Sequence, residues 1–321
     1  MKIIFMGTPE SAVPSLRRCV EDGHEVLGVW TQPDRPAGRG NKLKAPPVKE
    51  LAVSRGLVVH QPLKIKTEEA LALFTEHEFD AAVVVAYGRI LPPAFLRAPR
   101  LGCVNVHFSL LPKYRGAAPV NWALVRGERE TGVTTMLMDE GLDTGPVLLQ
   151  RSTEIEEGET APRLLERLSH TGAELLSETL ARFGEMEPRP QDDAHATLAP
   201  ILRREDGLID WSLDAAQIEQ RVRGLQPWPN AFTTHHGRRL IVWRAEARGR
   251  EAGLGDAAPA GEGTAAAAAG TVIAARGDEL FVACGGETTL KLLEVQPEGK
   301  QRLSARDFIN GSRAQAGEKL G

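Results

Sequence analysis

The segment from Cys103 to Pro119 restricts the fold of this chain more than any other stretch. It begins as a short apolar run that carries two polar residues, Asn105 and His107. Because these residues are two positions apart, their side chains face the same side of a strand. Prolines and a glycine then interrupt regular structure before a helical pattern resumes at residue 121. A polar pair at the end of a buried strand favours an active-site edge in an open α/β sheet, although the same residues could merely cap the next turn.

A second strand pattern, from Thr134 to Pro146, breaks into an acidic turn that contains Asp143 between two glycines. A carboxylate beside an imidazole holds the ring in one tautomer and favours its protonated form. We therefore predict that Asp143 completes a catalytic set with Asn105 and His107. The alternative is that Asp143 only caps the segment that follows it.

The first half of the chain alternates strand and helix patterns, which predicts a Rossmann-like open α/β sheet. The continuous apolar run at 79–87 is typical of a central parallel strand. The glycine fingerprint GxGxxG is absent after the first strand, which disfavours a nucleotide-dependent oxidoreductase. The predicted strands span residues 2–6, 24–31, 57–62 and 79–87, and the predicted helices span 11–20 and 67–77.

The second half predicts a long helix and a separate domain. A leucine stripe at helical spacing predicts an amphipathic helix over 160–183, and the start of 185–205 is rich in proline and acidic residues, as in a linker. We predict a catalytic domain over 1–184, a linker over 185–205 and a small antiparallel β-barrel domain over 206–321. The low-complexity stretch 248–270 is predicted to be a surface insertion, without an assigned function. The strand patterns of the barrel span residues 231–234, 239–245, 270–274, 280–283 and 289–295.

The loop from Gln32 to Val48 concentrates positive charge. Its basic residues are Arg35, Arg39, Lys42 and Lys44, against one acidic residue, Asp34. A basic, irregular loop can clamp a phosphate backbone as it orders on binding, but most such clusters are only solvated loops. The loop alone leaves both interpretations open.

Charge, cysteine spacing and the lack of long apolar runs exclude several classes of protein. The formal net charge is -4, so a nucleic-acid site must be a local basic patch. The three cysteines are far apart and form no CxxC pair, which argues against a disulfide framework or a zinc site and favours a reducing compartment. The sequence has no signal-peptide pattern and no apolar run of the roughly 20 residues that span a bilayer. We therefore expect a cytoplasmic monomer without a membrane segment or a metal.

Two stretches of the sequence resemble the formyltransferases that use 10-formyltetrahydrofolate. They are the run NVHFSLLPKYRGAAP at 105–119 and the turn GLDTG at 141–145. The start IFMGTP at 4–9 and the loop TQPDRPAGRG at 31–40 narrow the resemblance to the family that formylates methionyl-tRNA. The resemblance extends from residue 2 to about residue 310.

This resemblance implies an enzyme that transfers the formyl group of 10-formyltetrahydrofolate to the α-amino group of methionyl-initiator tRNA for translation initiation. It assigns catalysis to Asn105, His107 and Asp143, and it implies a C-terminal barrel of the oligonucleotide-binding (OB) type. The basic loop is implied to contact the tRNA, and the backbone after the central strand is implied to contact the folate. The implied tRNA contacts are Arg35, Arg39 and Lys42, and the implied folate contacts are Val85, Ala86, Tyr87, Gly88, Ser109, Leu110, Leu111 and Pro112.

The chain departs from relatives at three positions. Phe108 stands where many of them have a small residue, and on a strand its side chain should point away from His107. Leu198 and Ile201 stand where relatives often have tyrosine and lysine, which weakens the case for an RNA contact from the linker.

Three other functions share parts of this pattern. Glycinamide ribonucleotide formyltransferase has the same Asn/His/Asp set but would not need residues 203–321. Sugar-amine formyltransferases also share the set, usually with a different companion domain. A non-enzymatic RNA-binding protein would need the basic loop and the barrel but not the buried polar set. The combination of all three features favours the tRNA enzyme.

Overall fold

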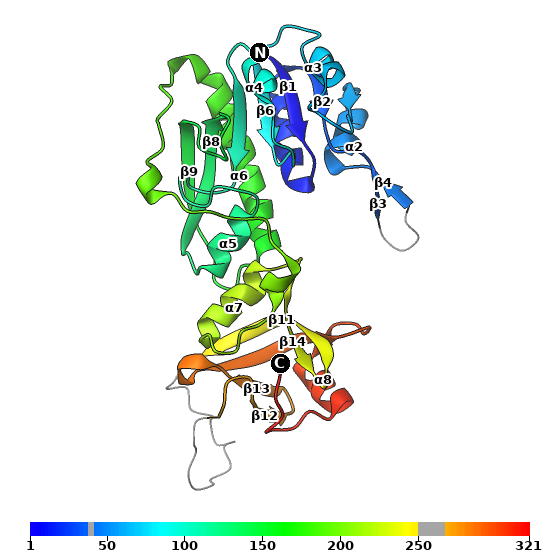
Figure 1. Cartoon of the computed structure of the whole chain (residues 1–321), viewed down its shortest axis with the longest axis vertical. Coiled ribbons are helices and arrows are strands. Elements are labelled where there is room, and N and C mark those ends of the chain that lie inside the picture. Colours follow the sequence, from blue (N-terminus) through cyan, green and yellow to red (C-terminus); the bar gives the residue numbers. More distant parts are fainter. Residues whose placement is uncertain (38–41, 250–266) are drawn as a thin grey trace. The chain divides into compact units, whose positions relative to one another are not determined.

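The computed structural model describes residues 1–37, 42–249 and 267–321, and the chain forms two compact units (Figure 1). The first unit comprises Met1–Pro119, Glu130–Ile155 and Arg163–Pro200. The second unit comprises Val120–Arg129, Glu156–Pro162 and Ile201–Gly321. The first 200 residues therefore contribute two short segments to the second unit.

The first unit is built on a seven-stranded sheet with the order β5-β2-β1-β6-β7-β8-β9. The strands from β5 to β7 are parallel, and β8 and β9 add to one edge in antiparallel orientation. This arrangement confirms the predicted open, mostly parallel α/β sheet. All five residues of the central strand β6 are buried, as its continuous apolar run predicts. The strands are β1 (Lys2–Gly7), β2 (Glu25–Trp30), β5 (Val59–His60), β6 (Ala81–Val85), β7 (Cys103–His107), β8 (Glu130–Leu137) and β9 (Val147–Glu154).

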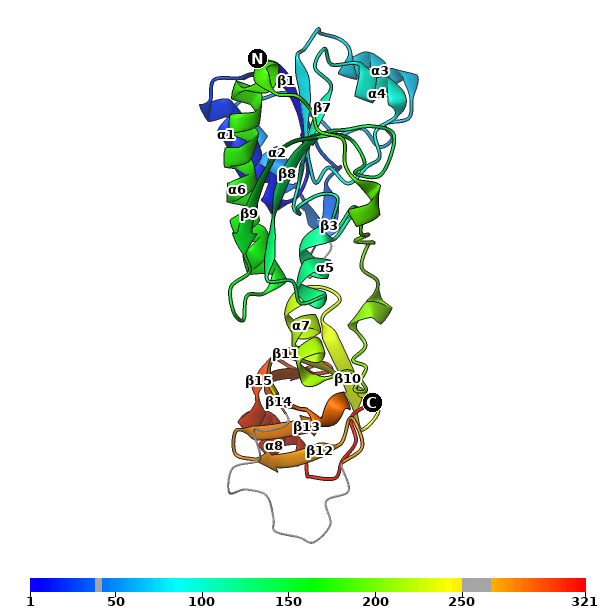
Figure 2. The same cartoon turned by 90° about the vertical axis from the view of Figure 1, so that its left-hand side faces the viewer.

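Helices cover both faces of this sheet (Figure 2). On one face, Arg18 of α1 donates a hydrogen bond of 3.2 Å to Ser177 of α6. On the other face, Phe74 of α3 stacks on Phe95 of α4 with ring centroids 4.4 Å apart, and both rings pack nearly perpendicular to the Trp30 ring, at 86°. Within the basic loop, β3 (Arg35–Ala37) and β4 (Lys42–Lys44) pair as two short antiparallel strands. The helices are α1 (Val13–Glu21), α2 (Pro47–Ser54), α3 (Glu68–Phe74), α4 (Pro93–Arg97) and α6 (Ala161–Ala181).

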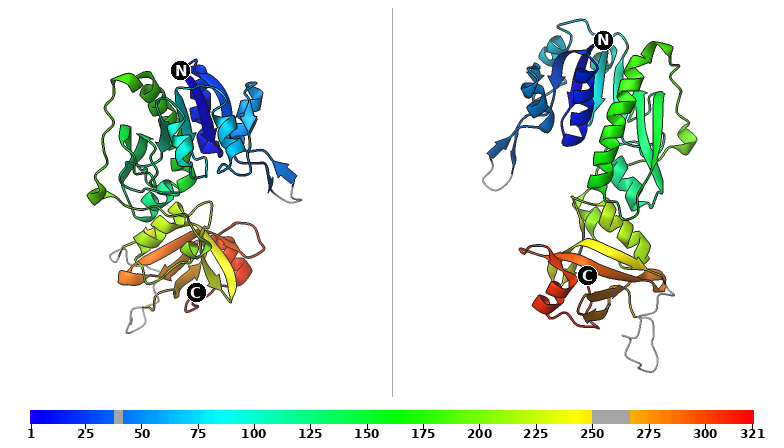
Figure 3. Two further views of the ribbon diagram at one scale, coloured as in Figure 1. Left: turned by 45° about the horizontal axis from the view of Figure 1, so that its top comes forward. Right: turned by 180° about the vertical axis from the view of Figure 1, so that it is seen from behind.

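Strand β7 divides its side chains between the two faces of the sheet. Helix α6 runs along this sheet (Figure 3). Val106 of β7 and Phe108, the residue after β7, face this helix, because a Cβ added at Gly172 of α6 would lie 3.0 Å from Val106 and 3.4 Å from Phe108. The glycine thus allows the helix to approach the strand closely. Asn105 and His107 lie on the opposite face, in agreement with the alternation expected of a strand.

Residues 186–200, which we call the strap, belong to the first unit although the sequence predicts a linker over 185–205. The strap pairs with β9 through two hydrogen bonds of 2.8 Å between Arg189 and Val147. Farther along, the Arg115 N–H donates to the Thr197 carbonyl at 2.8 Å, and the Ala199 N–H donates to the Arg115 carbonyl at 2.7 Å. These long-range backbone bonds hold the segment against the sheet, and local composition cannot predict them.

The second unit is an antiparallel sheet with the order β10-β11-β14-β13-β12, to which β15 adds beside β14. Trp211, Ile218 of α7 and Phe308 of α8 are buried in its core. This confirms the predicted antiparallel C-terminal domain. Its strands are β10 (Ala231–His235), β11 (Arg238–Arg248), β12 (Val272–Arg276), β13 (Glu279–Ala283), β14 (Thr289–Pro297) and β15 (Leu303–Ser304), and its helices include α5 (Pro119–Val125), α7 (Ala215–Gly224) and α8 (Ala305–Ser312).

The end of the chain links the two outer strands of this sheet. The Leu320 N–H donates to the Gly270 carbonyl at 2.8 Å, just before β12, and the Gly321 N–H donates to Thr234 of β10 at 3.0 Å. The terminal residues therefore connect the edges that a barrel would bring together. Of the predicted insertion at 248–270, residues 250–266 lie outside the described part of the chain.

Candidate active site

The three predicted catalytic residues lie together on one face of the first unit's sheet. Asn105 and His107 project from β7, and Asp143 comes from the loop between β8 and β9. The Asn105 Nδ2 lies 3.5 Å from Asp143 Oδ1, and the His107 Nδ1 lies 3.7 Å from Asp143 Oδ2. The side chains of His107 and Asp143 are only 6% and 15% exposed. The carboxylate therefore faces both an amide and an imidazole in a largely water-excluded place.

Each nitrogen of the His107 ring faces an acceptor. The Nε2 lies 2.9 Å from the Tyr114 carbonyl, and because a carbonyl only accepts, this nitrogen must donate. The Nδ1 faces the Asp143 carboxylate. Both ring nitrogens thus face oxygen atoms that can accept a hydrogen bond.

The backbone of the β8–β9 loop brings Asp143 into this position. Asp143 has a φ of 53°, in the left-handed region that favours glycine. Two residues later, a Cβ at Gly145 would collide with the Leu137 carbonyl oxygen, so the loop can fold back over β8 only with glycine there. The Asp143 Oδ2 accepts a hydrogen bond of 2.8 Å from the Gly116 N–H, which joins this loop to the loop after β7.

The loop after β7 uses most of its polar groups internally. The Ser109 hydroxyl donates to the Lys113 carbonyl at 2.6 Å. Thr134 of β8 donates to the Ser109 carbonyl at 2.6 Å and accepts from the Leu111 N–H at 3.1 Å. Among the predicted folate contacts, Ser109 and Leu111 are thus buried, whereas Leu110 and Pro112 are partly exposed. Thr134 is a structural determinant of this loop that sequence patterns alone do not reveal.

The segment after β6 supplies the other predicted folate contacts. Val85 is buried at the end of the strand, and Ala86 and Gly88 are exposed. The Tyr87 carbonyl accepts hydrogen bonds from Thr8 and from Gln32, both at 3.1 Å. Burial raises the pKa of the Tyr87 phenol to about 12. Its hydroxyl has no hydrogen-bond partner within the described ranges.

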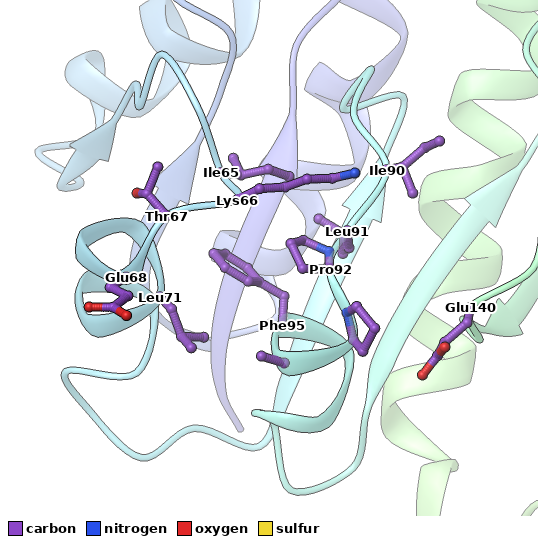
Figure 4. Close-up of a pocket in the computed structure, with 12 residues that line it drawn as sticks. Ile65, Lys66, Thr67, Glu68, Leu71, Ile90, Leu91, Pro92, Phe95 and Glu140 are labelled. Atoms are coloured by element: carbon purple, nitrogen blue, oxygen red, sulfur yellow. The ribbon is translucent and has the colours of Figure 1, made fainter.

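Two cavities open at this end of the sheet. The first, of about 500 Å³, is bordered by the loops after β5 and β6 and by Glu140 of the β8–β9 loop. Figure 4 shows Phe95 and Leu91 in its wall, with Lys66 extended across it. The second, of about 420 Å³, lies between the basic side chains Arg35 and Lys44 and the segment 86–88. Both volumes are typical of small-molecule sites.

The predicted RNA contacts are only partly described. Arg35 is exposed in β3, and its guanidinium lies 3.5 Å from Gln32 Oε1. Lys42 begins β4, and its side chain is not described. Arg39 lies outside the described residues.

In the described ranges, one group of side chains could hold a metal ion: His235, His236 and Glu318 of the second unit, whose ligand atoms lie within 4.8 Å of one another. Across these same ranges, every helix is too short or too polar to traverse a bilayer.

Comparison with known proteins agrees with this architecture. The formyl transferase family matches residues 1–180, and the formyl transferase C-terminal domain matches residues 201–313. An N-formyltransferase from Helicobacter canadensis, solved with folinic acid and dTDP-3-aminofucose, has a TM-score of 0.68 at 16% identity and covers 92% of this chain and 99% of its own. HypX from Aquifex aeolicus, solved with tetrahydrofolic acid, has a TM-score of 0.62 at 16% identity and covers 96% of this chain and 47% of its own. The fold and the domain pair thus define a formyltransferase.

Curated relatives narrow this class. Methionyl-tRNA formyltransferase of Caldanaerobacter subterraneus subsp. tengcongensis is 48% identical over 314 residues, 97% of each chain. That of Myxococcus xanthus is 48% identical over 320 residues, 99% of this chain and 97% of its own. The chain therefore belongs to the methionyl-tRNA formyltransferase family.

Proposed function

We propose that this protein transfers the formyl group of 10-formyltetrahydrofolate to the α-amino group of methionyl-initiator tRNA, which produces formylmethionyl-tRNA for translation initiation. The observation that carries the proposal is full-length identity of 48% to methionyl-tRNA formyltransferases in a chain whose Asn105, His107 and Asp143 converge. The enzyme acts as a monomer in the cytoplasm, where tRNA and folate meet.

In the proposed reaction the methionyl amine attacks the formyl carbon. A C–N bond forms, the carbonyl oxygen takes up negative charge, and the tetrahedral intermediate then loses the N10 nitrogen of the folate. The amine gives up one proton, and N10 takes one, so tetrahydrofolate leaves neutral at that atom. The protein must supply donors where the oxyanion develops and must carry this proton.

The three side chains divide these tasks. The Asn105 amide donates to the developing oxyanion, and the His107 ring donates to the same oxygen or carries the proton to N10. For this step the His107 Nε2 must exchange the Tyr114 carbonyl for the substrate. Asp143 orients the ring and balances its charge, because its carboxylate faces the Nδ1 at 3.7 Å. The set lies in a largely buried place, where such donors stabilise charge more strongly than in water.

The folate is held by the segments Val85–Gly88 and Ser109–Pro112. The apolar wall of the first cavity, which includes Ile90 and Phe95, offers a surface for a flat ring beside these segments. The tRNA is held mainly through its phosphates, with Arg35, Arg39 and Lys42 of the basic loop as contacts.

Replacing Arg35 by alanine is expected to weaken tRNA binding while leaving the chemical step almost unchanged. Loss of one phosphate contact should make the negative slope of log K against log salt shallower by about 1. Equilibrium binding of methionyl-initiator tRNA between low and physiological salt measures this slope. Arg17→Ala, an exposed arginine of α1, is the matched control. Equal slopes for wild type and both variants would refute the contact.

The nature of the acceptor is the point at which rival formyltransferases differ, since a solved protein of similar fold was crystallised with an amino-sugar nucleotide. The wild-type enzyme should be assayed with 10-formyltetrahydrofolate and either methionyl-initiator tRNA or a dTDP-amino sugar. We expect kcat/KM to favour the tRNA by more than about a hundredfold. Preference for the sugar would refute methionyl-tRNA as the acceptor, but it would not contradict the proposed formyl transfer from the folate.

A further inference from the structure

We propose that Gln191 of the strap, oriented by Arg115, is a positioning residue that holds Asp143 in place for formyl transfer. This inference rests on the proposed function, because it assigns a role within the same reaction. Residues 181–200 fall between the two family matches, which end at 180 and begin at 201. The strap nevertheless contacts the backbone of the loop that carries Asp143.

The Gln191 amide group joins the strap to the Asp143 loop. Its Nε2 donates to the Asp143 carbonyl at 2.8 Å and to the Gly145 carbonyl at 2.7 Å. Its Oε1 accepts from Arg115 Nε at 3.0 Å and from Arg115 Nη2 at 2.8 Å. The orientation of the amide is unambiguous, because a guanidinium only donates and a carbonyl only accepts. Both ends of the side chain are therefore fully engaged.

Asp143 needs such support because its backbone is strained. Its φ of 53° is unfavourable for a residue with a Cβ. Such a conformation persists only where the surroundings determine it. Two donated hydrogen bonds to the carbonyls of Asp143 and Gly145 fix the peptide units 143–144 and 145–146, and so they help to fix the direction in which the carboxylate points.

Arg115 connects Gln191 to the loop after β7, which contacts the Asp143 carboxylate. Its guanidinium is buried, the residue being 7% exposed, and it also pairs with Asp193 of the strap at 2.7 Å. A buried charge is costly unless it is paired and hydrogen-bonded, so Gln191 and Asp193 together satisfy it. The neighbouring Gly116 N–H donates to the Asp143 carboxylate. Gln191 thus acts on the backbone of Asp143, and Gly116 acts on its side chain.

Gln191→Glu separates positioning from simple attachment of the strap. The glutamate keeps an acceptor for Arg115 but loses both donors, and its oxygens repel the two carbonyls. We expect kcat to fall by about tenfold to a hundredfold, as for a misplacement of about 1 Å, while KM for tRNA and for folate changes little. Gln191→Met, which removes both the donors and the acceptor for Arg115 without adding charge, should lower kcat at least as much. Glu187→Gln, an exposed strap residue, should behave as wild type.

Amide hydrogen exchange by NMR gives a readout that does not depend on activity. Exchange of the Gly116 amide, which bonds to the Asp143 carboxylate, should accelerate in both Gln191 variants. The Ala118 amide, which bonds to the Ala199 carbonyl of the strap at 3.2 Å, should stay protected. Together these results would show a displaced carboxylate under an attached strap.

Two results would overturn the inference. One is a kcat within twofold of wild type with an unchanged Gly116 amide. The other is equal loss of protection at Gly116 and Ala118, which would mean that Gln191 only attaches the strap. If the wild-type enzyme failed to formylate methionyl-tRNA, the proposed function would fall, but the exchange data would still decide whether Gln191 holds Asp143.

Discussion

Replacing His107 by alanine is expected to lower kcat for formyl transfer by about a thousandfold, with little change in KM for either substrate. In the proposed mechanism the ring donates to the oxyanion or carries the proton to N10. Alanine leaves the Asp143 carboxylate without its imidazole and the Tyr114 carbonyl without its donor. Single-turnover formylation at saturating enzyme isolates this chemical step from product release.

His77→Ala is the matched control, because His77 is exposed in the same unit. The control should retain the wild-type rate, and both variants should keep the wild-type far-UV circular dichroism. A rate for His107→Ala within tenfold of wild type would mean that the imidazole neither donates in the transition state nor moves the proton.

Replacing Asn105 by alanine is expected to cost about a hundredfold to a thousandfold in kcat. In the proposed mechanism its amide is the neutral donor to the oxyanion, and its Nδ2 lies 3.5 Å from Asp143 Oδ1. Such donors act mainly on the transition state, so KM should change much less than kcat.

Asn105→Asp sharpens this test. Aspartate has nearly the same shape but cannot donate when ionised, and it would place a second carboxylate beside Asp143. We expect it to be at least as inactive as Asn105→Ala at neutral pH. Asn310→Ala, an exposed site on α8, is the control that should keep full activity. Retention of more than about a tenth of the wild-type rate by Asn105→Asp would exclude oxyanion donation as the role of Asn105.

The parts of the fold that depend on local pattern could be predicted from the sequence. Three local patterns predict which residues are buried or share a face. They are the apolar run of β6, the leucine stripe of α6, and the two-residue spacing of Asn105 and His107. The second unit's strands β10 to β14 were predicted within a few residues, because alternating runs between turn residues mark their positions.

Other elements were missed although a local signal was present. Helix α2 begins at Pro47, and proline is favoured at the first position of a helix. Helix α8 begins after Ser304, whose hydroxyl accepts a hydrogen bond from the Asp307 N–H. A serine followed three residues later by an acid is a recognisable start signal. The predicted third strand over 57–62 is reduced to Val59–His60, because only these residues pair with β2.

The geometry around the site could not be predicted, because it depends on contacts between distant segments. Gln191 and Asp143 are 48 positions apart, and Thr134 and Ser109 are 25 apart. A proline-rich, acidic composition is shared by free linkers and by extended segments that pair with a sheet, so it could not distinguish the strap from a linker. The left-handed φ of Asp143 likewise leaves no sequence signal beyond the neighbouring glycines.

The central proposal is tested most directly by incubating the wild-type enzyme with methionyl-initiator tRNA and 10-formyltetrahydrofolate labelled at the formyl carbon. The expected result is label on the α-amino group of methionine after the ester is cleaved, in equal amount to the tetrahydrofolate released, and almost none with His107→Ala. Release of tetrahydrofolate with label on water or on a small amine, and none on the tRNA, would contradict the proposed acceptor.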